Sequence, residues 1–193
     1  GVPLQGWQAY GPWAYSETDV DSEYFLDDKV KVLVANSEKG LDIRDAINRL
    51  REELRSPGVS VRIVGLSGVG KTRLVQALFD KRILTATAEL SLQEVIYTDL
   101  SHNPTPQPIA MLEALKVAGS AGVVVIDNCG QDIHQQLTEV VKRTGSKLRL
   151  VTVEYDIRDD LPEGTSCYQL EGAADEIIAK LLKRRYVSLS DID

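Results

Sequence analysis

The stretch from residue 61 to residue 82 constrains the fold of this chain more than any other. An apolar run, VRIVGL, leads into the glycine-rich octapeptide GLSGVGKT, which leads into a segment with apolar residues on one helical face. The octapeptide fits the pattern G-x-x-x-x-G-K-[ST] in full, and a chance match in a chain of this length is on the order of one in a hundred. The sequence therefore predicts a strand, a phosphate-binding loop and a helix, in that order.

The octapeptide has the residue types that phosphate binding needs. The four residues between Gly65 and Gly70 allow the loop to curl, so that successive N–H groups point at phosphate oxygens. The Lys71 ammonium reaches the β- and γ-phosphates, and the Thr72 hydroxyl is a hard oxygen ligand for Mg²⁺. Arg73 contacts the α-phosphate or the adenine edge, or is an ordinary residue of the helix surface. The competing interpretation of the motif is a glycine-rich turn whose lysine is merely solvated. The predicted nucleotide-binding residues are Gly65, Ser67, Gly68, Val69, Gly70, Lys71, Thr72 and Arg73.

Strands and helices alternate along most of the chain. Helical periodicity predicts helices at 70–82, 108–118, 131–143 and 173–185. Apolar runs predict strands at 61–66, 94–100, 122–127, 148–155 and 167–170. Five strands that alternate with helices predict the α/β class, with a three-layer P-loop fold around a mainly parallel five-stranded sheet.

The N-terminal part follows another pattern. Residues 1–28 hold both tryptophans and an acidic stretch without helical periodicity, which is typical of an arm that wraps a surface or belongs to a preceding domain. A strand at 29–36 and a helix at 40–54 follow, with Asp42 as the expected N-cap of the helix. We therefore divide the chain into an arm with a strand and helix at 1–57 and a nucleotide-binding core at 58–193.

A second apolar run, VVVID, ends on Asp127. A phosphate loop needs a carboxylate that holds Mg²⁺ from the end of a nearby strand, and Asp127 stands at the expected place. The competing interpretation is a helix N-cap. The letters DNCG also fit the D-x-x-G of GTPases, but the chain has no [NT]-K-x-D sequence to recognise guanine, and the segment between the two motifs indicates a strand and a helix rather than a hairpin. Thr72 and Asp127 are the predicted metal ligands.

Three stretches together resemble the nucleotide-binding core of the STAND ATPases, the AAA+-related group that includes NACHT and NB-ARC proteins. They are VRIVGLSGVGKTRLVQALFD, VVVIDNC and LRLVTVEYD, and the resemblance covers roughly residues 58–190. It implies that the P-loop, or Walker A motif, binds ATP or ADP with Mg²⁺, and that slow hydrolysis controls the opening and oligomerisation of a multidomain signalling protein. It also implies that the lid and winged-helix parts lie outside this chain.

Departures from that family leave hydrolysis open. Members often carry a second acid directly after the strand-ending Asp, as the base that orients water, whereas this chain has Asn128, which cannot accept a proton. The next strand of the family often ends in a polar sensor, and here Thr152 either contacts the γ-phosphate or is a routine strand residue. Glu154 either orients water in place of Asn128 or lies outside the site in a cap or salt bridge. The predicted catalytic residues are Lys71, Asp127, Asn128 and Glu154.

Several functions fit these motifs. The first is a slowly hydrolysing regulatory ATPase, and the second is a nucleotide-binding module without significant hydrolysis, which Asn128 favours. A P-loop phosphotransferase is less well supported, because the sequence shows no arginine-rich lid and no evident acceptor site. A nucleic-acid translocase would need domains that lie outside this sequence.

Composition narrows the partners. The chain of 193 residues has a net charge of −7, which argues against a large nucleic-acid interface. No apolar run approaches the ~18 residues of a membrane span and no signal-peptide pattern is present, so we expect a cytoplasmic protein without a membrane partner. The chain begins without Met, so we expect a piece of a larger protein, whose remaining domains and a nucleotide-driven oligomer would be its partners.

The cysteines and histidines have no metal-binding spacing. Cys129 and Cys167 are therefore expected to be free, buried thiols. His102 and His134 are expected to be surface or helix residues.

Overall fold

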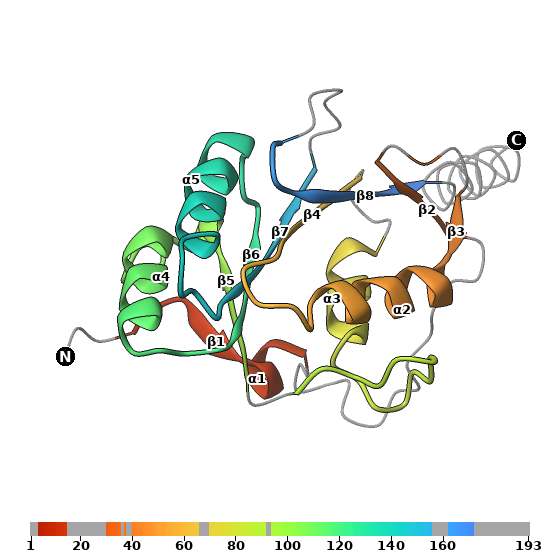
Figure 1. Ribbon diagram of the computed structural model, residues 1–193, viewed down its shortest axis with the longest axis horizontal. Coiled ribbons are helices and arrows are strands. Elements are labelled where there is room, and N and C mark those ends of the chain that lie inside the picture. The colour runs from red at the N-terminus through yellow and green to blue at the C-terminus, as the bar shows by residue number, and fades with distance from the viewer. Residues whose placement is uncertain are drawn as a thin grey trace, which may run out of the picture.

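One mixed sheet with helices on both faces organises the part of the chain that the computed structural model describes (Figure 1). The described residues are 4–14, 30–35, 37, 40–65, 70–91, 94–155 and 162–171. The strands are β1 (Trp7–Ala9), β2 (Lys31–Val34), β3 (Leu41–Asp42), β4 (Ser60–Val64), β5 (Val95–Asp99), β6 (Val123–Asp127), β7 (Arg149–Glu154) and β8 (Ser166–Glu171). The helices are α1 (Tyr10–Ala14), α2 (Ile43–Glu53), α3 (Lys71–Ala77), α4 (Pro108–Val117) and α5 (Gln131–Val141), with a short 3-10 helix at Leu100–His102.

The strand order is β1-β5-β6-β7-β4-β8-β2-β3. The five central strands, from β5 to β8 in that order, pair in parallel, and β1, β2 and β3 pair antiparallel at the two edges. The α/β class is confirmed. The predicted count of five strands is wrong, since the described sheet has eight. The additional strands come from the first 42 residues, which lie outside the alternating pattern on which the count rested.

Helices α2 and α4 begin where the sequence predicts. The Asp42 carboxylate accepts a hydrogen bond from the Asp45 N–H at 2.7 Å, as an N-cap does. Pro108 is the first residue of α4, where a missing N–H leaves no helical hydrogen bond unmade. Side-chain chemistry at single positions therefore sets both helix starts.

Helix α3 ends five residues earlier than the predicted residue 82, at Ala77. Arg51, which is 1% exposed, reaches the end of α3 from α2. Its guanidinium donates to the carbonyls of Ala77, Leu78 and Asp80 at 2.9, 3.1 and 3.0 Å. These carbonyls of Ala77, Leu78 and Asp80 also accept backbone N–H groups, from Asp80, Leu90 and Ile83 respectively, so the chain after Ala77 forms turns in place of the i→i−4 ladder of a helix.

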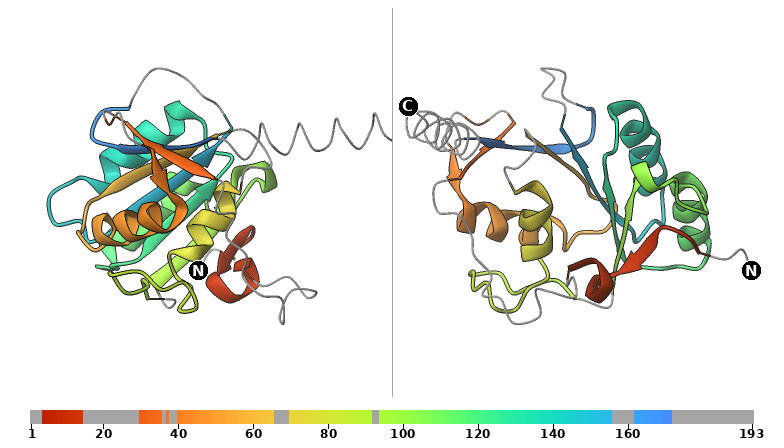
Figure 2. Two further views of the ribbon diagram at one scale, coloured as in Figure 1. Left: turned by 90° about the vertical axis from the view of Figure 1, so that its right-hand side faces the viewer. Right: turned by 180° about the vertical axis from the view of Figure 1, so that it is seen from behind.

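Helices cover both faces of the sheet (Figure 2), and a layer of core side chains lies on each face. Alternate side chains of β6 pack into the two layers: Val125 packs in the layer with α2 and α3, and Val124 packs in the layer with α4 and α5. A strand buried on both faces needs a continuous apolar run, which explains the sequence VVVI before Asp127. Cys129 and Cys167 are free and buried, as predicted.

The N-terminal segment joins the same sheet. β1 pairs antiparallel with β5, and α1 follows it directly. β2 pairs with β8, and its Val32 and Val34 are buried as the alternation in the sequence predicts. The division of the chain at residue 57 stays a prediction, and the predicted helix at 173–185 lies outside the described residues. None of the helices in the described ranges is long and apolar enough to cross a membrane.

Candidate functional site

The predicted phosphate loop has glycine at both described ends for a conformational reason. Gly65 has a φ of 151° and Gly70 a φ of 87°. A residue with a side chain costs about 1–2 kcal/mol in the left-handed region that Gly70 occupies. Space is not the constraint there, because the nearest atom to an added Cβ at Gly70 would be the Cβ of Arg73, at 4.0 Å. The intervening Ser67, Gly68 and Val69 lie outside the described residues.

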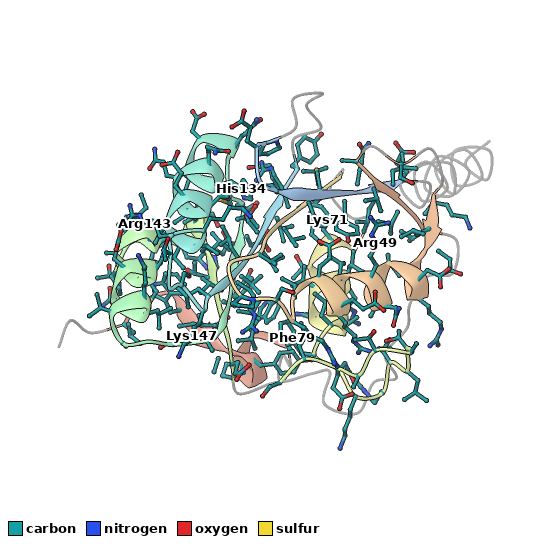
Figure 3. All side chains as sticks on the ribbon, in the orientation of Figure 1. Arg49, Lys71, Phe79, His134, Arg143 and Lys147 are labelled. Atoms are coloured by element: carbon teal, nitrogen blue, oxygen red, sulfur yellow. The ribbon has the colours of Figure 1, made fainter. Side chains whose placement is uncertain are left out.

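Lys71 begins α3, and Figure 3 labels it at that end of the helix, with Phe79 beyond the other end. Its ammonium donates to the Gly65 carbonyl. Burial lowers the pKa of Lys71, and the negative charges of Asp127 and Glu154 oppose this shift. Lys71 is therefore a partly buried cation that both predicted acids influence.

Asp127 ends β6 and accepts three hydrogen bonds. Its Oδ2 accepts from the Thr72 hydroxyl at 3.2 Å and from the Tyr97 hydroxyl at 3.0 Å. Its Oδ1 accepts from the Asn128 N–H at 2.8 Å. These donors orient the carboxylate, and Thr72 and Asp127 lie side by side although 55 positions separate them in the sequence.

Asn128 has a left-handed backbone and points its side chain at a second acid. Its φ is 53°, a conformation that asparagine tolerates better than most residues. Its side-chain amide donates to Asp99 Oδ1 at 2.9 Å, and Asp99 is the register partner of Asp127 on β5. Hydrogen bonds from Asn128 and Ser101 lower the pKa of Asp99, against burial, which raises it. Asn128 therefore bonds to the acid of the neighbouring strand.

Glu154 and Arg73 are the outlying members of the predicted site. Glu154 ends β7, is half-buried, and accepts the N–H of Tyr155 at 2.9 Å. Arg73 is exposed on α3. Their predicted roles, in orienting water and in contacting nucleotide, stay predictions.

The oxygen atoms of Thr72 and Asp127 fit a magnesium ion. Adjacent ligands of an octahedral Mg²⁺ lie about 3 Å apart, since each metal–oxygen distance is about 2.1 Å. The hydroxyl and carboxylate oxygens are 3.2 Å apart. Among the described residues no group of three or more His, Cys, Asp or Glu side chains could hold a metal. Two protein oxygens are fewer than the six ligands of Mg²⁺, so an ion held here would need water or phosphate oxygens for the other positions.

Thr152, the predicted phosphate sensor, belongs to a buried polar network on the α5 side of the sheet. Its hydroxyl is 2.7 Å from His134 Nδ1 and accepts from Arg62 at 3.1 Å. His134 is 0% exposed and lies between α5 and β7 (Figure 3). The network occupies the Thr152 hydroxyl, and of the two expected settings for His134 the structure gives a helix residue that is fully buried.

Tyr97 and Asp99 are not among the site residues predicted from the sequence. Both lie in the strand EVIYTDL, and the period of two places Tyr97 and Asp99 on one face of it. That alternation was the available signal. It could not show that Tyr97 reaches Asp127, because the contact depends on the register between β5 and β6.

Comparisons with known proteins do not assign this chain to a family. No family model matches the chain, and no curated protein matches it. A chain of a solved structure, described as the E. coli MS115-1 HORMA:CdnC:Trip13 complex, matches at 13% sequence identity with a TM-score of 0.40. The match covers 71% of this chain and 60% of that one. A likeness this weak carries no argument about function.

The assignment to the STAND group is corrected on these findings. No family model and no curated protein of that group, or of any other, matches the chain. The resemblance rested on the octapeptide, on Asp127 at the end of VVVID and, elsewhere, on the order of elements, and unrelated functions share such features within one fold class. The predictions that followed from it, a P-loop NTPase of the AAA+ and STAND type and a slowly hydrolysing switch in signal transduction, are corrected with it.

Proposed function

We propose that this chain binds a magnesium-complexed nucleotide, ATP or ADP, through its phosphates. The site is the edge of the sheet where β4, β6 and β7 end. The proposal rests on one observation above all: the Thr72 hydroxyl and the Asp127 carboxylate, 55 positions apart, meet at 3.2 Å. It concerns binding and assigns no reaction.

The residues of the proposed site have different roles toward the phosphates and the magnesium ion. Lys71 supplies a positive charge for the phosphates, and partial burial strengthens its attraction because less water screens it. Thr72 and Asp127 supply hard oxygen atoms for Mg²⁺, and the bound ion would offset negative charge on the phosphates. Gly65 and Gly70 supply the backbone angles that carry the chain from β4 into α3.

The hydrogen bonds of Asp127 support its part in the proposal. Tyr97 and Asn128 hold the carboxylate from two directions. A ligand held in place before the ion arrives loses less conformational entropy on binding than a mobile one. Preorganisation of this kind is what a metal-binding carboxylate needs.

Titration with a fluorescent ADP analogue tests the proposal. Wild type is compared with Lys71→Met and with Lys81→Met, which removes the same charge from an exposed residue outside the site. We expect Lys71→Met to weaken binding at least about tenfold, which corresponds to about 1.4 kcal/mol. We expect Lys81→Met to bind as wild type does, and EDTA to weaken binding in wild type.

Two results would refute nucleotide binding at this edge. The first is equal affinity of wild type and Lys71→Met, with both proteins shown to be folded by circular dichroism. The second is wild-type binding that magnesium and inorganic pyrophosphate leave unchanged, because a phosphate-directed site must respond to both.

A further inference from the structure

The aromatic residue that holds Asp127 also contacts the N-terminal segment. Tyr97 donates its hydroxyl to Asp127 Oδ2 at 3.0 Å. On its face, the Tyr97 ring stacks on Trp13 of α1, with centroids 4.5 Å apart and 11° between the planes. One side chain thus links α1 to the carboxylate of the proposed magnesium site.

Residues 6–14, here called the arm, attach to α3, which carries Thr72, and to β5, which pairs with the strand that carries Asp127. On β5, Gln8 is the register partner of Tyr97, and the Thr98 hydroxyl donates to the Gly6 carbonyl at 2.6 Å. On α3, the Gln76 side chain donates to the Trp13 carbonyl at 3.4 Å. Helix α3 is the helix that carries Thr72. The arm therefore contacts the supports of both predicted metal ligands.

Trp13 sits in a cluster of aromatic rings. It meets Tyr10 edge-on at 6.0 Å and Phe79 at 6.5 Å, and Tyr10 meets Phe79 at 5.7 Å. Edge-to-face contacts of this kind stabilise packed aromatic rings beyond the area they bury. The cluster fixes the plane of the Trp13 ring on which Tyr97 rests.

One buried polar atom of the arm lacks a hydrogen bond to the part of the chain that the structure describes. Trp13 Nε1 is buried without a hydrogen-bond partner among the described residues. A buried donor that lacks an acceptor destabilises the state that buries it, so this nitrogen opposes docking of the arm.

We propose that Tyr97 is a positioning residue for Asp127, and that docking of the arm through Trp13 is coupled to occupancy of the magnesium–nucleotide site. This inference rests on the function proposed above. Coupling between two sites is reciprocal, so the arm strengthens magnesium binding by the same factor by which bound magnesium–nucleotide strengthens docking of the arm.

The test measures both directions of the coupling. The variants are Tyr97→Phe, which keeps the stacked ring and removes the hydroxyl, and Trp13→Leu, which removes the stack. The matched control is Trp7→Phe in the same arm, because the Trp7 indole bonds to the Pro106 carbonyl rather than to Tyr97. The magnesium concentration for half-maximal ADP binding is measured first, and hydrogen exchange of residues 6–14 is measured next, with and without Mg²⁺ and ADP.

We expect Tyr97→Phe and Trp13→Leu to raise the magnesium requirement about five-fold or more. In EDTA, both variants should bind ADP with the same affinity as wild type in EDTA. Mg²⁺ and ADP together should slow exchange in the arm of wild type and Trp7→Phe, and not in Tyr97→Phe. If Lys71→Met loses binding while Tyr97→Phe and Trp13→Leu keep the wild-type magnesium requirement, the coupling is refuted and nucleotide binding stands. If wild type does not bind ADP, both proposals fall.

Discussion

The side-chain amide of Asn128 donates to Asp99 Oδ1 at 2.9 Å, across the ends of two neighbouring parallel strands. The same residue gives its backbone N–H to Asp127. Asn128 therefore joins two acids: it holds Asp127 through the main chain and bonds to Asp99 through the side chain. Both bonds follow from a backbone with φ of 53° that turns the chain directly after β6.

Substitutions of Asn128 separate its backbone role from its side-chain role. Asn128→Gly removes the side-chain amide and keeps easy access to the left-handed backbone conformation. Asn128→Ala also removes the amide, and alanine adopts the left-handed conformation less readily. We expect Asn128→Ala to have a free energy of unfolding about 1 kcal/mol lower than Asn128→Gly, because the left-handed backbone costs more for alanine than glycine loses in chain entropy. Urea unfolding measures the difference, and an alanine variant as stable as the glycine variant would contradict a conformational role.

Substitution of Arg51, the buried arginine of the α2–α3 contact, is predicted to lower the stability of the fold. Arg51→Met removes the charged side-chain donor from the buried carbonyls of Ala77, Leu78 and Asp80, which then keep only their backbone donors. We expect the free energy of unfolding to fall by about 3 kcal/mol. Arg55→Met, at an exposed position on the same segment, should change it by no more than about 0.5 kcal/mol. Similar losses in both variants would mean that the carbonyl contacts contribute little.

His134 predicts a loss of stability in acid. Burial, assisted by the positive charge of Arg62, lowers the pKa of His134 from 6.5 to about 3. The unfolded state therefore binds a proton that the folded state does not between these two values. The contribution of His134 is complete above pH 6.5 and falls by about 1.4 kcal/mol per pH unit as the pH drops toward 3.

Urea unfolding between pH 7 and pH 4 measures this contribution. His134→Gln removes the titrating group, so the difference in stability between wild type and this variant should shrink as the pH falls. The exposed His102→Gln serves as the control and should keep the wild-type slope. A difference between wild type and His134→Gln that stays constant with pH would contradict the assignment.

Much of the fold follows from local patterns in the sequence. The alternation of apolar runs and helical faces predicts the five parallel strands, because strands buried on both faces must be apolar throughout. Asp42 and Pro108 fix two helix starts through chemistry within a few residues. The edge strand β1 is three residues long, too short to show a period, and it was not predicted.

What the sequence could not show depends on contacts between distant segments. At the end of α3, Arg51 bonds to the Ala77 carbonyl, which lies 26 positions further along the chain. The bonds of Asn128 to Asp99 and of Tyr97 to Asp127 require the register of two strands that are separated by helix α4. The octapeptide and the VVVID run predicted that Thr72 and Asp127 act together, and the structure places their oxygens within 3.2 Å.

Magnesium binding at the proposed site depends most directly on the Thr72 hydroxyl as an oxygen ligand. Thr72→Val keeps the shape of the side chain and removes the hydroxyl, whereas Thr72→Ser keeps the hydroxyl. Calorimetry of a magnesium titration at a fixed ADP concentration gives the magnesium requirement of each variant. We predict that Thr72→Ser binds with the wild-type magnesium requirement and that Thr72→Val needs at least about ten times more magnesium, a cost of about 1.4 kcal/mol. A magnesium requirement in Thr72→Val that equals that of wild type would contradict the proposed site.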